Sequence, residues 1–253
     1  MKRILTAAIG IPLVIAVTLY SPHWFFALVV ALFAGLCFHE LTTMGSARLS
    51  TSHSSWGGLA AAAVTASFVG DSSWVLTMTV AAFLFCLLVM TFEGAVGNML
   101  PNISLVGLGL IYCGVLAGFL IWLSPRSVFV LFGTIWAGDA AAYYGGRALG
   151  RHKLAPTISP NKTVEGSICG LIASAIAGTG LGVWLIGLSI PFLIVASLAT
   201  AIAGQIGDLA ESALKRSSGV KDSSSLLPGH GGVLDRLDSL LFAAPVFYWF
   251  LHS

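Results

Sequence analysis

The chain has 253 residues, of which 57% are hydrophobic and only 9% are charged. Soluble domains carry roughly 25% charged residues, so a water-soluble fold of this length could not bury so much apolar surface, and a membrane protein is expected. The formal net charge of +2 is too small to indicate a nucleic acid as a partner.

The apolar segments predict an all-α fold, a polytopic transmembrane helical bundle. A helix needs about 20 apolar residues to cross the hydrocarbon core of a bilayer. Clusters of turn-forming residues separate such segments at Ser21-Pro22, Asp71–Ser73, Pro101-Asn102 and Ser189–Pro191. In chain order, the nine predicted spans are 4–20, 23–43, 56–70, 74–92, 103–124, 128–146, 166–188, 190–214 and 237–251.

The distribution of Lys and Arg predicts the orientation. With the N-terminus in the cytoplasm, nine spans place residues 44–55, 93–102, 147–165 and 215–236 on the cytoplasmic side. Every Lys and Arg except Arg126 then lies on that side, in agreement with the positive-inside rule. The two halves also differ in polarity: residues 1–130 are hydrophobic with few acids, whereas residues 131–253 carry most of the charge, so the chemistry is expected there.

Asp139 is the first acid expected to serve the function. It lies near the predicted cytoplasmic end of the span 128–146. A carboxylate inside a span costs at least about 2.5 kcal/mol on insertion scales, so it usually faces a cavity or a partner. Gly166 and Gly170, in the span 166–188, are spaced for close helix packing.

The loop 147–165 is a candidate phosphate-binding segment. Two prolines predict an ordered turn rather than a helix in its second half. Its cations can hold a triphosphate or a lipid phosphate, and two hydroxyls can add hydrogen bonds; attraction to anionic lipid is the alternative explanation. These candidates are Arg147, Lys153, Ser159, Lys162 and Thr163.

Asp208 lies inside the apolar run 190–214, close to its predicted cytoplasmic end. At helical spacing Asp208 shares one face with Ser212 and Lys215, and Glu211 lies beside them. The same cost of burying a carboxylate indicates a cavity, a metal or a salt bridge within the bundle. Elsewhere, His39-Glu40 is interpreted as a satisfied pair rather than a ligand set.

The most informative segment runs from Ser212 to Asp238. Carboxylates are the ligands that Mg²⁺ prefers, Lys and Arg neutralise phosphate oxygens, and glycines let backbone N–H groups approach an anion. An ordinary cytoplasmic loop explains its basic residues but not its acids or glycines. The candidates are Lys215, Arg216, Lys221, Asp222, His230, Gly231, Gly232, Asp235, Arg236 and Asp238.

The spacing of the acids predicts a metal site. Asp235 and Asp238 lie one turn apart at the start of the last span. If that helix end packs against the end of the run 190–214, Asp208 and Asp235 can converge on a divalent cation. Asp139 and Asp238 are the further candidate ligands.

On these residues the chain resembles the phosphatidate cytidylyltransferase (CDP-diglyceride synthase) family. The segment Ser212–Asp238 is similar to the family's diagnostic segment, and the segments Asp139–Gly150 and Lys153–Gly166 are also similar. Ala140 and Asn161 depart from the family's pattern, which puts peripheral contacts in doubt. The resemblance covers residues 136–240, whereas the N-terminal half is similar only as a hydrophobic bundle.

The resemblance implies that CTP and phosphatidic acid react to give CDP-diacylglycerol and pyrophosphate. It implies dependence on Mg²⁺, with a second cation in the manner of two-metal sites, and a homodimer in a bacterial inner membrane with its active site facing the cytoplasm. The N-terminal half would shape a cavity for the acyl chains of the membrane lipid.

It also implies roles for individual residues. Asp208 and Asp235 would act with Lys215 and Arg236 at the reacting phosphate. Arg216 and Lys221 would bind CTP phosphates, while Asp222 and His230 would orient them, and His230 is also a proton-transfer candidate.

Two other functions stay open. An ion channel or secondary transporter could use the intramembrane Asp139 and Asp208, although the charge is confined to one half and no internal repeat is evident. A CTP-dependent polyisoprenol kinase could use the same loops. A CDP-alcohol phosphotransferase is disfavoured because its Asp-Gly motif does not occur in the chain.

Overall fold

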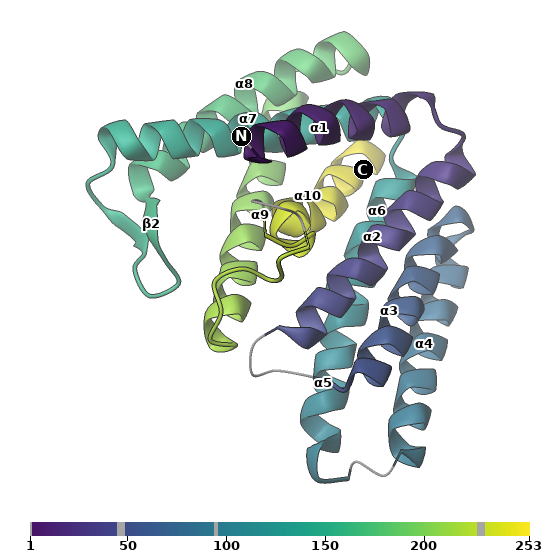
Figure 1. Ribbon diagram of the computed structural model, residues 1–253. Coiled ribbons are helices and arrows are strands. Elements are labelled where there is room, and N and C mark those ends of the chain that lie inside the picture. Colours follow the sequence, from purple (N-terminus) through teal and green to yellow (C-terminus); the bar gives the residue numbers. More distant parts are fainter. Residues whose placement is uncertain (1, 45–48, 94–95, 227–230) are drawn as a thin grey trace. The chain divides into compact units, whose positions relative to one another are not determined.

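The computed structural model describes residues 2–44, 49–93, 96–226 and 231–253. These residues form helices and one two-stranded hairpin (Figure 1). The elements are α1 (Lys2–Tyr20), α2 (His23–Thr43), α3 (Thr51–Ala66), η1 (Ser67–Val69), α4 (Ser72–Phe92), η2 (Val96–Asn98), α5 (Met99–Gly109), η3 (Leu110–Val115), α6 (Leu116–Trp122), α7 (Pro125–Leu149), β1 (Lys153–Ala155), β2 (Ser159–Thr163), α8 (Val164–Leu185), α9 (Ile190–Ser217) and α10 (Leu234–His252).

Each predicted span coincides with a helix. The span 103–124 corresponds to a continuous run of α5, the π-helical η3 and α6. Within the described residues, five segments are long and apolar enough to cross a membrane, namely α2, α4, Met99–Trp122, α8 and α9. The chain is therefore a helical membrane protein, while the count of nine spans remains a prediction.

Three of the four predicted breaks extend into the first turn of the helix that follows, namely α4, α5 and α9. Pro101 and Asn102 lie inside the first turn of α5, which begins at Met99. Proline is tolerated there because the first N–H groups of a helix have no partner within the helix. The prolines near the starts of α7 and α9, Pro125 and Pro191, follow the same rule.

Short polar side chains fix the starts of several helices. Ser124 accepts a hydrogen bond from the backbone N–H of Ser127 at the start of α7. Thr163 does the same for Gly166 at the start of α8, over 3.1 Å. Such caps satisfy N–H groups that the helix itself leaves without a partner.

The contacts group the chain into two compact units. The first contains Met1–Trp122 and Ser218–Arg236, and the second contains Leu123–Ser217 and Leu237–Ser253. The segment 218–236 thus packs with the N-terminal helices. The division at residue 130 expected from the sequence concerns where the chemistry lies, and it stays a prediction.

Small residues let α7 and α8 approach closely within the second unit. The buried face of α8 has a small residue at every fourth position: Gly166, Gly170, Ser174, Gly178 and Gly182. A Cβ added at Gly166 would lie 2.7 Å from the backbone oxygen of Ala142 on α7. The prediction that Gly166 and Gly170 serve helix packing is therefore confirmed.

The loop after α7 is ordered and not helical, as predicted. Strands β1 and β2 pair antiparallel, with Lys153 opposite Thr163 and Ala155 opposite Ser159. The carboxylate of Glu165, in the first turn of α8, accepts hydrogen bonds from the backbone N–H groups of Arg151 and His152. The hairpin is thereby anchored at its base.

Candidate active site

A pocket of about 460 Å³ lies in the second unit, where α7, the hairpin, α8 and α9 meet. This volume falls within the range of about 300–1,000 Å³ that is usual for ligand pockets. Five residues singled out from the sequence line it: Asp139, Arg147, Lys162, Thr163 and Asp208. The structure thus brings together candidates that lie up to about seventy positions apart in the sequence.

Opposite charges face each other in this pocket. The Lys162 ammonium lies 2.5 Å from a carboxylate oxygen of Asp208, and both side chains are about one-third exposed. The first turn of α8 also faces the pocket through Gly166 and Ser167. A helix N-terminus presents partial positive charge, so Lys162 and this helix end both favour an anion.

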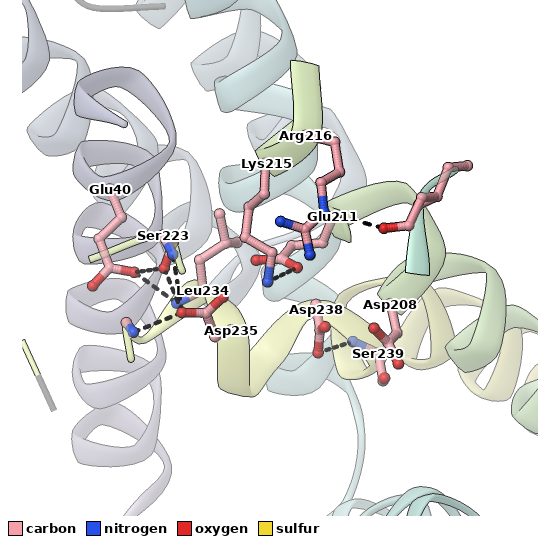
Figure 2. A network of polar contacts seen from close by, with 12 residues as sticks. Glu40, Asp208, Glu211, Lys215, Arg216, Ser223, Leu234, Asp235, Asp238 and Ser239 are labelled. Carbon is pink, nitrogen blue, oxygen red and sulfur yellow. Dashed lines mark hydrogen bonds and ion pairs between the residues drawn. The ribbon is translucent and has the colours of Figure 1, made fainter. Parts of the chain in front are cut away.

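Three carboxylates from three helices gather in the second unit. Asp238 on α10 interacts electrostatically with Asp208 on α9 and with Asp139 on α7. Figure 2 shows Asp208 beside Asp238, whose own carboxylate accepts the backbone N–H of Ser239. A Cβ at Gly207 would lie 2.5 Å from the backbone oxygen of Asp238, so α9 and α10 approach closely at this point, as expected.

Lys215 and Arg216 have protein partners at the end of α9. The Lys215 ammonium lies 2.5 Å from the carboxylate of Glu211, one turn earlier, and Glu211 is completely buried. Arg216 donates from Nε to the backbone oxygen of Ile158, in the turn between β1 and β2, over 3.2 Å (Figure 2). The end of α9 is thereby tied to the hairpin.

In the first unit, Asp235 organises the loop before α10. Its Oδ2 accepts hydrogen bonds from the backbone N–H groups of Gly232, over 2.7 Å, and Ser223, over 3.0 Å. Gly231 has a φ of +79°, a left-handed conformation that favours glycine. The glycines were predicted to bring N–H groups close to an anion, and the anion that Gly232 contacts is Asp235 of the protein itself.

Comparison with known proteins decides the family. The whole chain, residues 1–253, matches the cytidylyltransferase family. The chain belongs to this family.

Individual relatives agree with that assignment. A phosphatidate cytidylyltransferase of Bacillus subtilis is 38% identical over 191 residues, which cover 72% of this chain and 70% of the relative. Relatives with the same name from Staphylococcus haemolyticus and Brucella suis are 45% and 52% identical over 141 and 128 residues. These matches cover 53% and 49% of this chain, and this chain spans about half of those relatives, 54% and 46% of their lengths.

Not every residue predicted to serve the site lies at the pocket. Lys153 is exposed on β1 and Ser159 is half-buried on β2, and neither lines the pocket. Lys221, Asp222 and Arg236 are exposed in the first unit.

Two of the predicted roles stay open. Asp235 belongs to the first unit and Asp208 to the second, so their convergence on one cation remains a prediction. His230 lies outside the described residues.

The sequence analysis missed two polar residues that line the pocket. Ser167 on α8 donates its hydroxyl proton to the side-chain oxygen of Gln205 on α9, and Gln205 Nε2 donates to the backbone oxygen of Ser167. Gln205 lies in an apolar run three positions before Asp208. Because residues three apart share a helix face, that spacing was the signal that could have found it.

The sequence analysis also did not connect Glu40 with the loop that carries Asp235 and Arg236. Its interpretation as a satisfied residue is confirmed, but its partners are Ser223, Ser224, Val233 and Leu234 rather than His39. These partners lie at least 183 positions away in the sequence, and no local pattern indicates them.

Proposed function

We propose that this cytidylyltransferase transfers the cytidylyl group of CTP to phosphatidate, giving CDP-diacylglycerol and pyrophosphate. The observation that carries the proposal is the pocket of the second unit, in which Arg147 and Lys162 face Asp139 and Asp208. The names of the relatives supply the lipid acceptor.

The lining of the pocket suits phosphate groups. Arginine binds phosphate oxygens through two parallel N–H bonds, and lysine supplies a compact point charge. Arg147 and Lys162 provide one of each, and the partial positive charge at the N-terminus of α8 adds to theirs. Leu154, Ala142 and Tyr143 give the same pocket an apolar wall.

The reaction asks the protein mainly for positioning. A phosphate oxygen of the lipid attacks the α-phosphorus of CTP in line, the new P–O bond forms, and pyrophosphate leaves. A phosphomonoester has a second pKa of about 6, so the attacking phosphate is already ionised near neutral pH and needs no strong base. Charge neutralisation by Arg147, Lys162 and Lys215 then stabilises the transition state.

The residues present fit a magnesium ion. Asp139 and Asp208 line one pocket and Asp238 interacts with both, and carboxylate oxygens are hard ligands. Among the described residues, no three His, Cys, Asp or Glu side chains form a ready-made metal site. Mg²⁺ is commonly held by one or two carboxylates together with substrate phosphates, which matches this donor set, and it would supply charge neutralisation.

The setting of the reaction follows from its substrates. CTP is dissolved in the cytosol and phosphatidate is held in the leaflet, so the two meet at the cytoplasmic face of a bacterial inner membrane. We propose nine spans with the N-terminus in the cytoplasm, which puts the loops 147–165 and 215–236 at that face, and an assembly of two copies. The N-terminal helices would accommodate the acyl chains.

The position of the transferred label tests the reaction. Purified protein is incubated with a divalent cation, CTP labelled in either its α- or its γ-phosphate, and either phosphatidate or a polyprenol as the acceptor. Cytidylyl transfer carries only the α-label into chloroform-soluble lipid. Transfer of the γ-label to a polyprenol, without α-label in phosphatidate, would instead indicate a CTP-dependent kinase and refute the proposal.

A further inference from the structure

Glu40 is a buried carboxylate in α2, one of the helices that are long and apolar enough to cross a membrane. It lies near the C-terminal end of α2, and its side chain is 4% exposed. A charge so deeply buried is strongly unfavourable unless it is hydrogen-bonded. The reaction proposed above assigns no task to Glu40.

Four donors from one distant loop surround this carboxylate. Oε1 accepts from the Ser224 hydroxyl over 2.7 Å and from the Val233 N–H over 2.9 Å. Oε2 accepts from the Ser223 hydroxyl over 3.0 Å and from the Leu234 N–H over 2.8 Å. Figure 2 shows the contacts of Glu40 with Ser223 and Leu234.

The number of donors excludes a role as a metal ligand in this arrangement. A carboxylate offers about four lone-pair positions, and the four donors match them. Two of the donors, Val233 and Leu234, stand at the start of α10, where N–H groups have no partner within the helix. Glu40 therefore caps α10 from another helix.

The same contacts reach Asp235. The hydroxyl of Ser223 lies 3.0 Å from Glu40 Oε2 and 3.1 Å from Asp235 Oδ2, so one side chain joins the two carboxylates. An added Cβ at Gly232 would collide with both Ser223 and Glu40. The backbone directly before Asp235 is thus held against Glu40.

We infer that Glu40 is a positioning residue that fixes the described parts of the loop around residues 223–224 and 232–234, and with them Asp235 and Arg236, for cytidylyl transfer. The inference rests in part on the proposed function, because that function gives the loop its task. Glu40 itself touches no reactant. Its contribution is to hold the loop backbone in one conformation.

The first test is amide hydrogen exchange in the full-length, detergent-purified protein. Glu40→Gln keeps the shape of the side chain but replaces one acceptor oxygen with an NH₂ group, which cannot accept two of the four donors. We expect faster exchange at Val233 and Leu234. Thr42→Val is the matched control, because Thr42 is buried on the same helix but bonds to Ser54 and Phe38 instead of the loop.

The second test separates positioning from general destabilisation. In Glu40→Gln we expect kcat to fall about 10–100-fold, as for residues that orient metal or catalytic ligands, while KM for phosphatidate changes less than about twofold. Thr42→Val should leave both constants near wild type at a matched melting temperature. Unchanged exchange at positions 233 and 234, or a kcat within twofold of wild type, would overturn the inference.

A milder variant covers the case in which Glu40→Gln does not fold. Ser224→Ala removes one donor from the loop side and should change exchange and kcat in the same direction, by a smaller factor; no change in either would again overturn the inference. If wild-type protein transfers no label but Glu40→Gln still accelerates exchange, the proposed reaction fails and the loop anchor stands. The two failures are therefore distinguishable.

Discussion

The ion pair between Lys162 and Asp208 illustrates how a single contact can matter more for function than for stability. Both side chains are about one-third exposed, and exposed pairs contribute about 0–1 kcal/mol to folding. In the pocket, however, the pair places a cation and a carboxylate where a phosphate and a divalent cation are proposed to bind.

Lys162→Gln should therefore weaken substrate binding without unfolding the protein. A hydrogen bond to a charged group is worth about 1.5–3 kcal/mol, so we expect KM for CTP or for phosphatidate to rise about 10–100-fold. The melting temperature should stay close to that of wild type. Steady-state kinetics and thermal unfolding in detergent measure the two effects.

Arg126→Gln is the matched control for this prediction. It removes one cation from the same unit, at the start of α7 and outside the residues that line the pocket. Equal effects of the two substitutions on KM would show that Lys162 acts only through the overall charge.

For single residues, the sequence could identify functional acids and bases because burying a charge among apolar residues costs free energy. It could not identify the residues that they contact. Asp139 and Asp208 were found because a carboxylate in a span needs an explanation, and both line the pocket. Gln205 was missed because an uncharged amide is cheaper to bury. The partners of Glu40 follow only from the tertiary fold, which brings α2 to a loop far along the chain.

The glycines of helix α8 differ in how much space the neighbouring helices leave for a side chain. At Gly178 an added Cβ would lie 2.5 Å from Thr134 Oγ1 on α7 and even closer to Ser197 Oγ on α9. At Gly180, two positions on, it would meet nothing within 4 Å. One helix therefore carries a glycine that packing requires and another that it does not.

Gly178→Ala and Gly180→Ala should differ in their effects on stability. Overpacking costs about 1–3 kcal/mol, so Gly178→Ala should lower the melting temperature. Gly180→Ala should leave it unchanged or raise it, because alanine is favoured over glycine by roughly 0.5–1 kcal/mol inside a helix. Thermal unfolding of the pair in the same detergent checks this, and a loss of stability at Gly180 of equal size would contradict the packing explanation.

The hairpin depends on the anchor that Glu165 provides at its base. Glu165→Ala removes the acceptor of the Arg151 and His152 N–H groups, so we expect faster tryptic cleavage after Arg151 and Lys153. Cleavage after Lys221, in the other unit, is the internal reference. If the ratio of the two rates does not change, Glu165 does not hold the hairpin.

The helical elements were largely predictable, since apolar length alone located each of them. The break assigned to Pro101 lies a few residues too late, because proline is as compatible with a first helical turn as with a loop. The hairpin was predicted only as an ordered segment. Its strands are short, and no alternation of apolar and polar residues marks them in the sequence.

For the whole molecule, the sequence predicts the orientation in the membrane, and this prediction has to be tested by experiment. Helix α7 has 25 residues, a length of about 38 Å at about 1.5 Å per residue. The hydrocarbon core of a bilayer is about 30 Å thick. By length alone the two ends of α7 can lie on opposite sides, although α7 is not among the five described segments that are also apolar enough to span.

Single cysteines at the two ends of α7 test this orientation. In a cysteine-free background, Arg126→Cys should react with a membrane-impermeant maleimide added outside intact cells. Arg151→Cys should react only in inverted vesicles, because the positive-inside rule places residue 151 in the cytoplasm. The reverse pattern would refute the proposed topology, and labelling of both from one side would remove α7 from the spans.

The measurement that tests the central claim most directly is transfer of α-labelled CTP into lipid by wild type, Asp208→Asn and the control Asp71→Asn. Asp71 is an exposed acid at the start of α4 in the other unit. We expect wild type and Asp71→Asn to label lipid only when phosphatidate and a divalent cation are present. Asp208→Asn should transfer label at least about a hundredfold more slowly, with an unchanged melting temperature. Absence of label with folded wild type, or equal rates for Asp208→Asn and Asp71→Asn, would contradict the account.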